Sequence, residues 1–190
     1  MNDENLNLAV IVGSTREGRF GPVVANWLAG QARQHDGMDV DVIDLAEARL
    51  PGELSKAPTP EVTAVTERLE AADAFVVVTP EYNHSFPASL KTVIDWHYTE
   101  WQAKPVGFVS YGGLAGGLRA VEHLRVVFAE LHAVTIRDTV SFHGVWGQFN
   151  DSGRLLNPDG PNAAAKTMLD QLAWWGFTLR EARATHPYRT

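Results

Sequence analysis

The sequence predicts an α/β fold, a three-layer sandwich in which a five-stranded parallel sheet carries helices on both faces. Five short, largely apolar segments alternate along the chain with five longer segments whose apolar residues recur at helical spacing. Residues 8–12 and 75–78 are apolar throughout, which is typical of strands that are buried on both faces. Strict alternation of this kind requires parallel strands joined by right-handed crossovers.

The first half of the chain is predicted to supply three strands. It contains, in order, strand 6–12, loop 13–20, helix 22–34, strand 38–45, helix 61–72 and strand 75–79. Pro22 is favourable in the first turn of its helix. Residues 38–45 alternate between apolar and acidic side chains, which indicates a strand with one wetter face at the edge of the sheet.

The second half is predicted to complete the sheet. It contains helix 87–98, strand 105–110, a glycine-rich turn at 111–117, helix 118–131, strand 134–140 and a closing helix at 162–177. The tract 142–150 between the last strand and the closing helix has no role that its residues indicate. Trp96 and Trp101 are expected either in a subunit contact or in the core of the chain itself.

Composition excludes several classes of protein. At 190 residues the chain fits one domain, predicted over residues 1–190 with a core at about residues 6–178. A net charge of −7 argues against a nucleic-acid binder, which usually displays a basic face. The chain has no cysteine, so disulfides, thiolate metal sites and redox chemistry on its own sulfur are excluded.

No membrane or metal partner is expected. The first residues are acidic and polar, without the basic start and apolar core of a signal peptide, and no apolar run approaches the roughly 20 residues of a membrane span. A cytoplasmic protein is therefore predicted. The seven histidines show no tight ligand spacing, so no metal site is predicted.

Three unusual loops are expected to converge on one crevice. In the flavodoxin-like strand order 2-1-3-4-5, a ligand crevice opens beyond the carboxyl ends of strands 1 and 3, where the order reverses. Here those ends are residues 13–20 and 80–86, and residues 110–117 follow the neighbouring strand.

The first of these loops has the composition of an anion site. A loop that enters a helix N-terminus leaves backbone N–H groups unpaired, and the helix dipole adds partial positive charge. Ser14 and Thr15 add hydroxyl donors, and Arg16 and Arg19 add charged ones. Two arginines favour a terminal phosphate monoester over a pyrophosphate diester. The loop matches neither the dinucleotide fingerprint nor the P-loop, and a polar surface turn is the alternative.

The other two loops can meet a flat ring. Pro80 and Pro87 stiffen the second loop, in which Tyr82 is suited to contact a ring unless it packs inward. Glycines in the third loop allow its backbone to approach a ligand closely. Gly116 and Gly117 form either a second anion-binding helix N-terminus, with Arg119 nearby, or only a flexible turn.

Together the three loops resemble a known family. Gly13-Ser14-Thr15-Arg16-x-Gly18-Arg19, Pro80-Glu81-Tyr82-Asn83-His84-Ser85 and Ser110-Tyr111-Gly112-Gly113, in this order and spacing over residues 6–142, are similar to motifs of the NADPH-dependent FMN reductases. That family includes quinone, azo and chromate reductases on a flavodoxin-like fold. The resemblance implies non-covalently bound FMN, held by Ser14, Thr15, Arg16, Arg19, Phe20, Pro80, Glu81, Tyr82, Asn83, His84, Ser85, Ser110, Tyr111, Gly112 and Gly113.

The resemblance also implies an activity and an assembly. Hydride would pass from NADPH or NADH to the flavin N5 and then to a quinone-like or other small electron acceptor in a ping-pong reaction, in a homodimer or homotetramer. No catalytic side chain is expected, because the cofactor carries the chemistry. Two alternatives stay open: release of reduced FMN to a partner monooxygenase, and a non-catalytic flavin-binding partner that senses redox state. His84 is expected either to donate a proton or to face solvent.

Overall fold

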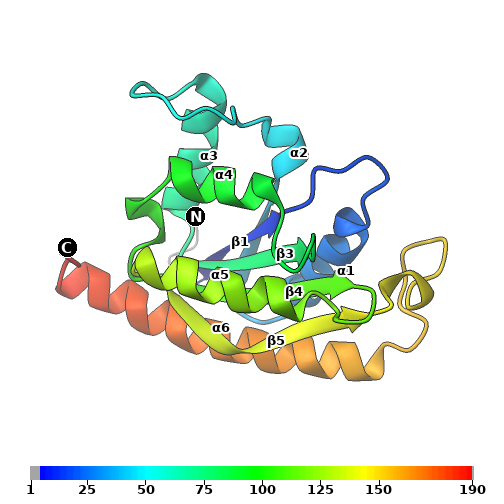
Figure 1. The fold of residues 1–190 in the computed structure, drawn as a ribbon. Coiled ribbons are helices and arrows are strands. Elements are labelled where there is room, and N and C mark those ends of the chain that lie inside the picture. Colours follow the sequence, from blue (N-terminus) through cyan, green and yellow to red (C-terminus); the bar gives the residue numbers. More distant parts are fainter. Residues whose placement is uncertain (1–4, 190) are drawn as a thin grey trace.

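The chain forms the predicted parallel sheet. In a computed structural model, which describes residues 5–189, five strands lie in the order β2-β1-β3-β4-β5, and each neighbouring pair is parallel (Figure 1). They are β1 (Leu6–Val12), β2 (Met38–Asp44), β3 (Ala74–Pro80), β4 (Pro105–Gly112) and β5 (Val134–His143). The order is the flavodoxin-like one that was predicted, with the alternating strand β2 at an edge.

Helices cover both faces of the sheet (Figure 1). On one face lie α1 (Gly21–Arg33) and α6 (Asp159–Thr185); on the other lie α3 (Pro60–Ala71), α4 (Ala88–Trp96) and α5 (Leu118–Glu130). Three short helices, α2 (Leu45–Ala48), η1 (Thr99–Trp101) and η2 (Val145–Gly147), lie in the connections. Because side chains alternate along a strand, Leu8 and Val10 pack toward α1 and α6, whereas Ala9 and Ile11 pack toward the opposite layer.

Several elements end at other residues than the sequence predicts. β4 continues through Tyr111 and Gly112, because Tyr111 pairs with Pro80 on one side and with Phe142 on the other. β5 likewise runs on to His143. The closing helix α6 is longer than predicted at both ends, and its last turns carry Arg180 and Arg183.

Trp101 belongs to the core of the chain. It is fully buried, packs against Phe75 and Phe128, and donates its indole N–H to the carbonyl of His97 at 2.9 Å. Trp96 is half-buried and donates to the carbonyl of Pro51 at 2.8 Å. Of the two positions open for Trp101, the structure therefore selects the intrachain core.

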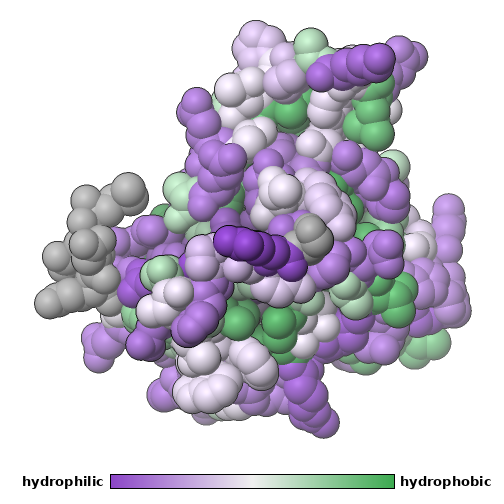
Figure 2. Space-filling model, turned by 90° about the vertical axis from the view of Figure 1, so that its left-hand side faces the viewer, coloured by the Kyte–Doolittle hydropathy of each residue, from purple (hydrophilic) through white to green (hydrophobic). Residues whose placement is uncertain are grey.

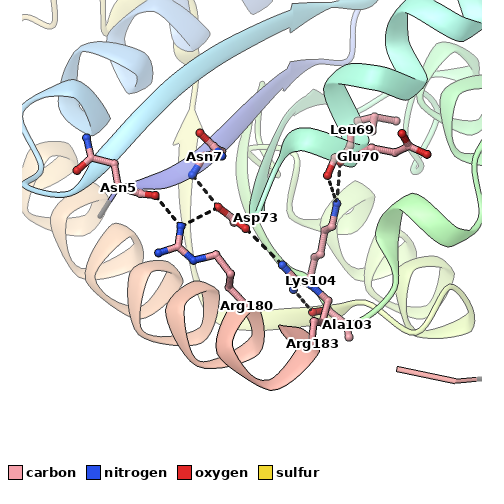
Figure 3. A network of polar contacts seen from close by, with 9 residues as sticks. All are labelled: Asn5, Asn7, Leu69, Glu70, Asp73, Ala103, Lys104, Arg180 and Arg183. Atoms are coloured by element: carbon pink, nitrogen blue, oxygen red, sulfur yellow. Dashed lines mark hydrogen bonds and ion pairs between the residues drawn. The ribbon is translucent and has the colours of Figure 1, made fainter. Parts of the chain in front are cut away.

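A charged network explains why α6 continues past its predicted end (Figure 3). Asp73, at the start of β3, contacts Arg180 at 3.2 Å and Arg183 at 3.4 Å, and its carboxylate accepts from the backbone N–H of Asn7 at 3.1 Å. Arg183 also donates to the carbonyl of Ala103 at 2.6 Å. The last turns of α6 are thus fixed to the amino ends of the strands. This end of the molecule faces the viewer in Figure 2, where hydrophilic side chains cover most of the surface.

Candidate functional site

A cleft opens at the carboxyl ends of the strands, at the opposite edge from the Asp73 network. Its volume is about 360 Å³. The loops after β1, β3 and β4 and the short helix η2 form its walls, on the right-hand side of Figure 1. The lining residues are Ser14, Arg16, Glu17, Gly18, Arg19, Phe20, Pro80, Glu81, Tyr82, Tyr111, Gly112, Gly113 and Trp146.

The loop after β1 presents unpaired donors. Within residues 5–189, the backbone N–H groups of Thr15, Arg16, Glu17 and Gly18 donate to no protein acceptor. In the same part of the chain, no acidic side chain pairs with the exposed guanidinium of Arg16. No side chain caps the N-terminus of the following helix α1. The dipole of α1 adds positive potential at that end. An anion at this position would meet several donors at once.

Arg19 has a different environment from Arg16. Its guanidinium forms a two-point ion pair with Asp44 at the end of β2, at 2.5 and 2.8 Å, and donates to the carbonyl of Ser14 at 2.9 Å. The hydrogen bond to Asp44 raises the pKa of Arg19 above its ordinary value. Asp44 also accepts from the backbone N–H of Ala46 and so begins α2. Arg19 therefore ties the loop to the neighbouring strand, although part of it lines the cleft.

Two tyrosines meet the hydroxyl of Ser14. The Ser14 Oγ lies 2.6 Å from the phenol oxygen of Tyr82, which joins the loop after β1 to the loop after β3. Tyr111 also reaches the start of α1: a Cβ atom on Gly21 would approach its phenol oxygen to 2.9 Å, so a side chain there would displace the tyrosine. Burial, with a contribution from Tyr82, raises the pKa of the Tyr111 phenol. The Tyr111 phenol consequently keeps its proton even above the ordinary tyrosine pKa of about 10.

The loop after β3 turns sharply beyond Tyr82. Tyr82 and Ser85 exchange two backbone hydrogen bonds, at 2.8 and 3.0 Å, around Asn83 and His84. Both turn residues have positive φ, 49° and 69°, and both side chains are exposed. The ring of His84 is tilted by 46° relative to that of His123, with ring centroids 6.1 Å apart. The tip of the loop therefore lies outside the cleft lining, while its start borders the cleft.

Glu81 carries a buried oxygen atom without a partner. The Glu81 side chain is only 8% exposed and forms an ion pair with Arg119 in the first turn of α5, whose side chain is 48% exposed. Within the described residues, the other carboxylate oxygen, Oε2, is buried and accepts no hydrogen bond. A buried acceptor that is left unsatisfied is costly, so this oxygen is suited to a donor on a bound ligand.

The third loop is held closed by a buried serine and by glycine. Ser110 is fully buried and donates its hydroxyl hydrogen to the carbonyl of Gly116 at 2.8 Å. Gly117, with φ of 84°, precedes α5, and a Cβ atom there would approach the side chain of Ser110 to 2.7 Å. Ser110 thus shapes the loop rather than the cleft surface. Arg119, which stands next to these glycines, is engaged by Glu81.

Ten of the fifteen predicted site residues line the cleft. The other five lie outside its lining: Thr15, Asn83, His84, Ser85 and Ser110. Thr15 instead borders a neighbouring hollow beside α2 and α4. Three lining residues were not predicted. Glu17 and Gly18 stand within the predicted loop. Trp146 lies in the tract without an assigned role, which also contains Phe142 and Phe149, so nothing in the sequence sets Trp146 apart.

Two further findings concern metal ions and membrane helices. Across residues 5–189, no three histidine, aspartate or glutamate side chains come together as they would around a metal ion. In the same span, no helix is both long enough and apolar enough to cross a membrane.

Comparison with known proteins gives concordant matches. The family model described as NADPH-dependent FMN reductase matches residues 6–147. An NAD(P)H-dependent FMN reductase of Schizosaccharomyces pombe is 37% identical over 58% of this chain, and the match spans 60% of that protein. A quinone reductase of Escherichia coli is 34% identical over 75% of this chain and 79% of its own length.

A solved structure shares the fold. The flavoenzyme NAD(P)H:(acceptor) oxidoreductase FerB of Paracoccus denitrificans superposes with a TM-score of 0.72, at 23% identity, over 91% of this chain and 98% of that one. At this identity the likeness concerns the arrangement of the sheet and its helices.

Proposed function

The chain belongs to the NADPH-dependent FMN reductase family, an oxidoreductase family that depends on FMN and NAD(P)H, and from this premise we propose how its cleft works. FMN binds in the cleft without a covalent bond, and the protein passes reducing equivalents from NAD(P)H to a small acceptor of the quinone type. The observation that carries this proposal is the row of unpaired backbone N–H groups beside Arg16, in the loop that leads into the N-terminus of α1.

The residues of the cleft fit FMN. A terminal phosphate needs several donors and positive charge, which the loop after β1 offers in its free amides, the Ser14 hydroxyl and Arg16. At the other wall, Glu81 Oε2 needs a donor, and the pyrimidine edge of a flavin carries an N–H group. Tyr82 and the backbone of Gly112 and Gly113 can border a flat ring system.

Each part of the site has a separate task. Arg16 and the free amides bind the phosphate, and Arg19 orients their loop through Asp44 and the Ser14 carbonyl. Tyr82 joins that loop to the loop that borders the ring. When bound, FMN supplies the redox chemistry, in which NAD(P)H is oxidised by loss of a hydride and a quinone, with two electrons and two protons, is reduced to the hydroquinone.

We further propose a ping-pong order of reaction. NAD(P)H and the acceptor would use the same open side of the cleft in turn, because its other walls are formed by the three loops. Initial-rate lines for varied NADPH and quinone would then be parallel, and converging lines would contradict a shared face. Assembly into homodimers or homotetramers and a cytoplasmic location remain predictions of the sequence.

An absorption spectrum tests the proposed function. The purified protein should show a flavin spectrum, by itself or after FMN is added, and anaerobic NADPH should bleach it. Steady NADPH oxidation with a quinone would exclude the binding-only alternative, and a rate that scales with micromolar free FMN would favour release of reduced flavin. A protein that neither binds FMN nor bleaches it would refute the proposal.

A further inference from the structure

Trp146 is a residue of the cleft wall to which the proposed function gives no task. It stands in η2, within the tract 142–150, and lines the cleft together with Pro80 and Tyr82. Its side chain is 67% exposed. An indole left in water forgoes the burial of a large apolar surface, so its exposure beside a ligand cleft calls for a physical reason.

The exposure of Trp146 does not come from a loosely held backbone. Its neighbour Val145 is fully buried in the core, and Phe149 is buried as well. The N–H of Gly144 donates to the carbonyl of Gly113 at 3.0 Å, and the side-chain amide of Gln148 donates to the carbonyl of His143 at 2.7 Å. The segment is therefore fixed, and it holds the indole at the cleft.

The indole lies beside a stretch of bare backbone. A Cβ atom on Gly113 would lie 4.0 Å from a carbon of the six-membered ring of Trp146, which is ordinary contact distance. Because Gly112 and Gly113 also line the cleft and carry no side chains, nothing from these residues shields the indole from the cleft. The next residue, Leu114, is 98% exposed. This side of the cleft thus presents an exposed indole, and an exposed leucine follows the lining residue Gly113.

We propose that Trp146 forms the aromatic wall of the acceptor subsite, against which a planar aromatic acceptor such as a naphthoquinone stacks. This inference rests on the proposed function and adds to it the residue that selects flat aromatic acceptors. Trp146 acts by holding the acceptor and takes no part in electron or proton transfer. Stacking on a fixed indole gains affinity from offset contact between rings, and it does so for many flat molecules alike.

The test compares Trp146→Ala and Trp146→Phe in the FMN-loaded protein, with Trp174→Ala as a matched control. Trp174 is a similarly exposed tryptophan, 61% accessible, on the outer side of α6. For Trp146→Ala we expect KM for menadione to rise about 10-fold with kcat little changed. Trp146→Phe should retain most of the affinity, and Trp174→Ala should match the wild type.

Four companion measurements separate the subsite from other roles of Trp146. The rate with ferricyanide, an oxidant without an aromatic ring, should stay unchanged, as should the Kd for FMN. Coumarin is a planar aromatic compound. Its affinity for the FMN-loaded protein, measured by titration calorimetry, should fall about 10-fold in Trp146→Ala. The sedimentation behaviour should match that of the wild type.

Each contrary result has a definite meaning. An unchanged menadione KM and unchanged coumarin affinity would overturn the subsite while the proposed function stands. A higher Kd for FMN would make Trp146 part of the flavin site, and altered sedimentation would make it a subunit contact; either result overturns the inference. If the wild type reduces neither menadione nor ferricyanide with NADPH, the proposed function and the inference fail together.

Discussion

Arg16 and Arg19 stand in one loop, but the structure gives their guanidinium groups different partners. Arg16 is exposed at the cleft, and among the described residues no carboxylate neutralises it, whereas Arg19 is held by Asp44 and by the Ser14 carbonyl. A cation whose charge is balanced by a carboxylate attracts an added phosphate less. The residue-scale expectation is therefore that Arg16 contributes more than Arg19 to the binding of the FMN phosphate.

Replacing Arg16 with alanine should weaken FMN binding selectively. Loss of a charge-assisted hydrogen bond costs about 1.5–3 kcal/mol, so we expect the Kd for FMN to rise about 10- to 100-fold. The Kd for riboflavin, which lacks the phosphate, should stay unchanged, and both are measured by fluorescence titration. Arg33→Ala, at the opposite end of α1, is the control. An equal loss for FMN and riboflavin would show that Arg16 does not meet the phosphate.

Replacing Arg19 with alanine should act mainly on stability. The variant leaves Asp44, whose side chain is 14% exposed, without the partner that binds it at two points. We expect the free energy of unfolding in urea to fall by about 2 kcal/mol. Because the loop is then less well ordered, FMN and riboflavin should both bind more weakly. A stable variant that loses affinity for FMN alone would instead assign Arg19 to the phosphate.

At the scale of elements, the amino ends of the strands depend on the last turns of α6. Asp73 joins Arg180 and Arg183 to the backbone of β1 (Figure 3). In Asp73→Asn the amide can still accept hydrogen bonds, but the carboxylate charge that contacts the two arginines is removed. We expect a loss of about 2–4 kcal/mol in the free energy of unfolding, measured in urea.

An exposed pair gives the matched control for Asp73. Asp95, 37% exposed, pairs with Lys91 one turn earlier on α4. Asp95→Asn should cost no more than about 0.5 kcal/mol, because exposed pairs at this helical spacing contribute little. Equal costs for the two substitutions would mean that the network around Asp73 adds nothing beyond a surface ion pair.

The local sequence pattern predicts the helices and strands far better than it predicts the contacts between residues of the site. The apolar runs and the alternation in β2 predict the strands and the edge position of β2, because burial imposes those patterns directly, whereas the full strand order was predicted from the flavodoxin-like fold. The partner of Arg19 was not predicted, since Asp44 is distant in sequence and only the parallel pairing of β1 with β2 brings it near. The place of Trp146 depends in the same way on Gly113, through the extension of β5 beside β4.

At the scale of the whole molecule, one buried lysine should make stability depend on pH. Lys104 precedes β4 and is 7% exposed; its Nζ donates to the carbonyls of Leu69 and Glu70, at 2.8 and 3.1 Å, at the end of α3 (Figure 3). Burial, together with the nearby Arg183 and against a partial opposing effect of Asp73, lowers the pKa of Lys104 to about 8. A neutral amine can still donate both hydrogen bonds.

The sign of the pH dependence follows from where the proton is bound. Above pH 8 the folded protein releases the proton of Lys104, whereas the unfolded chain holds it until about pH 10.4. The unfolded state thus binds more protons in this window, and the free energy of unfolding rises with pH there. The raised pKa of Tyr111 has the opposite effect only near and above the ordinary tyrosine pKa of about 10. The informative range therefore ends at about pH 9.5.

Urea unfolding of the wild type and of Lys104→Met between about pH 7 and about pH 9.5 tests this expectation. Methionine keeps an unbranched apolar stem but cannot titrate, so the wild type should gain up to about 2 kcal/mol relative to the variant as pH rises. Parallel pH profiles would mean that Lys104 titrates alike in the folded and unfolded chain.

The same unfolding curves test the prediction of a single domain. Because both helical layers pack on one sheet, the transitions followed by fluorescence and by circular dichroism should coincide. Separate transitions would divide the chain into independent units.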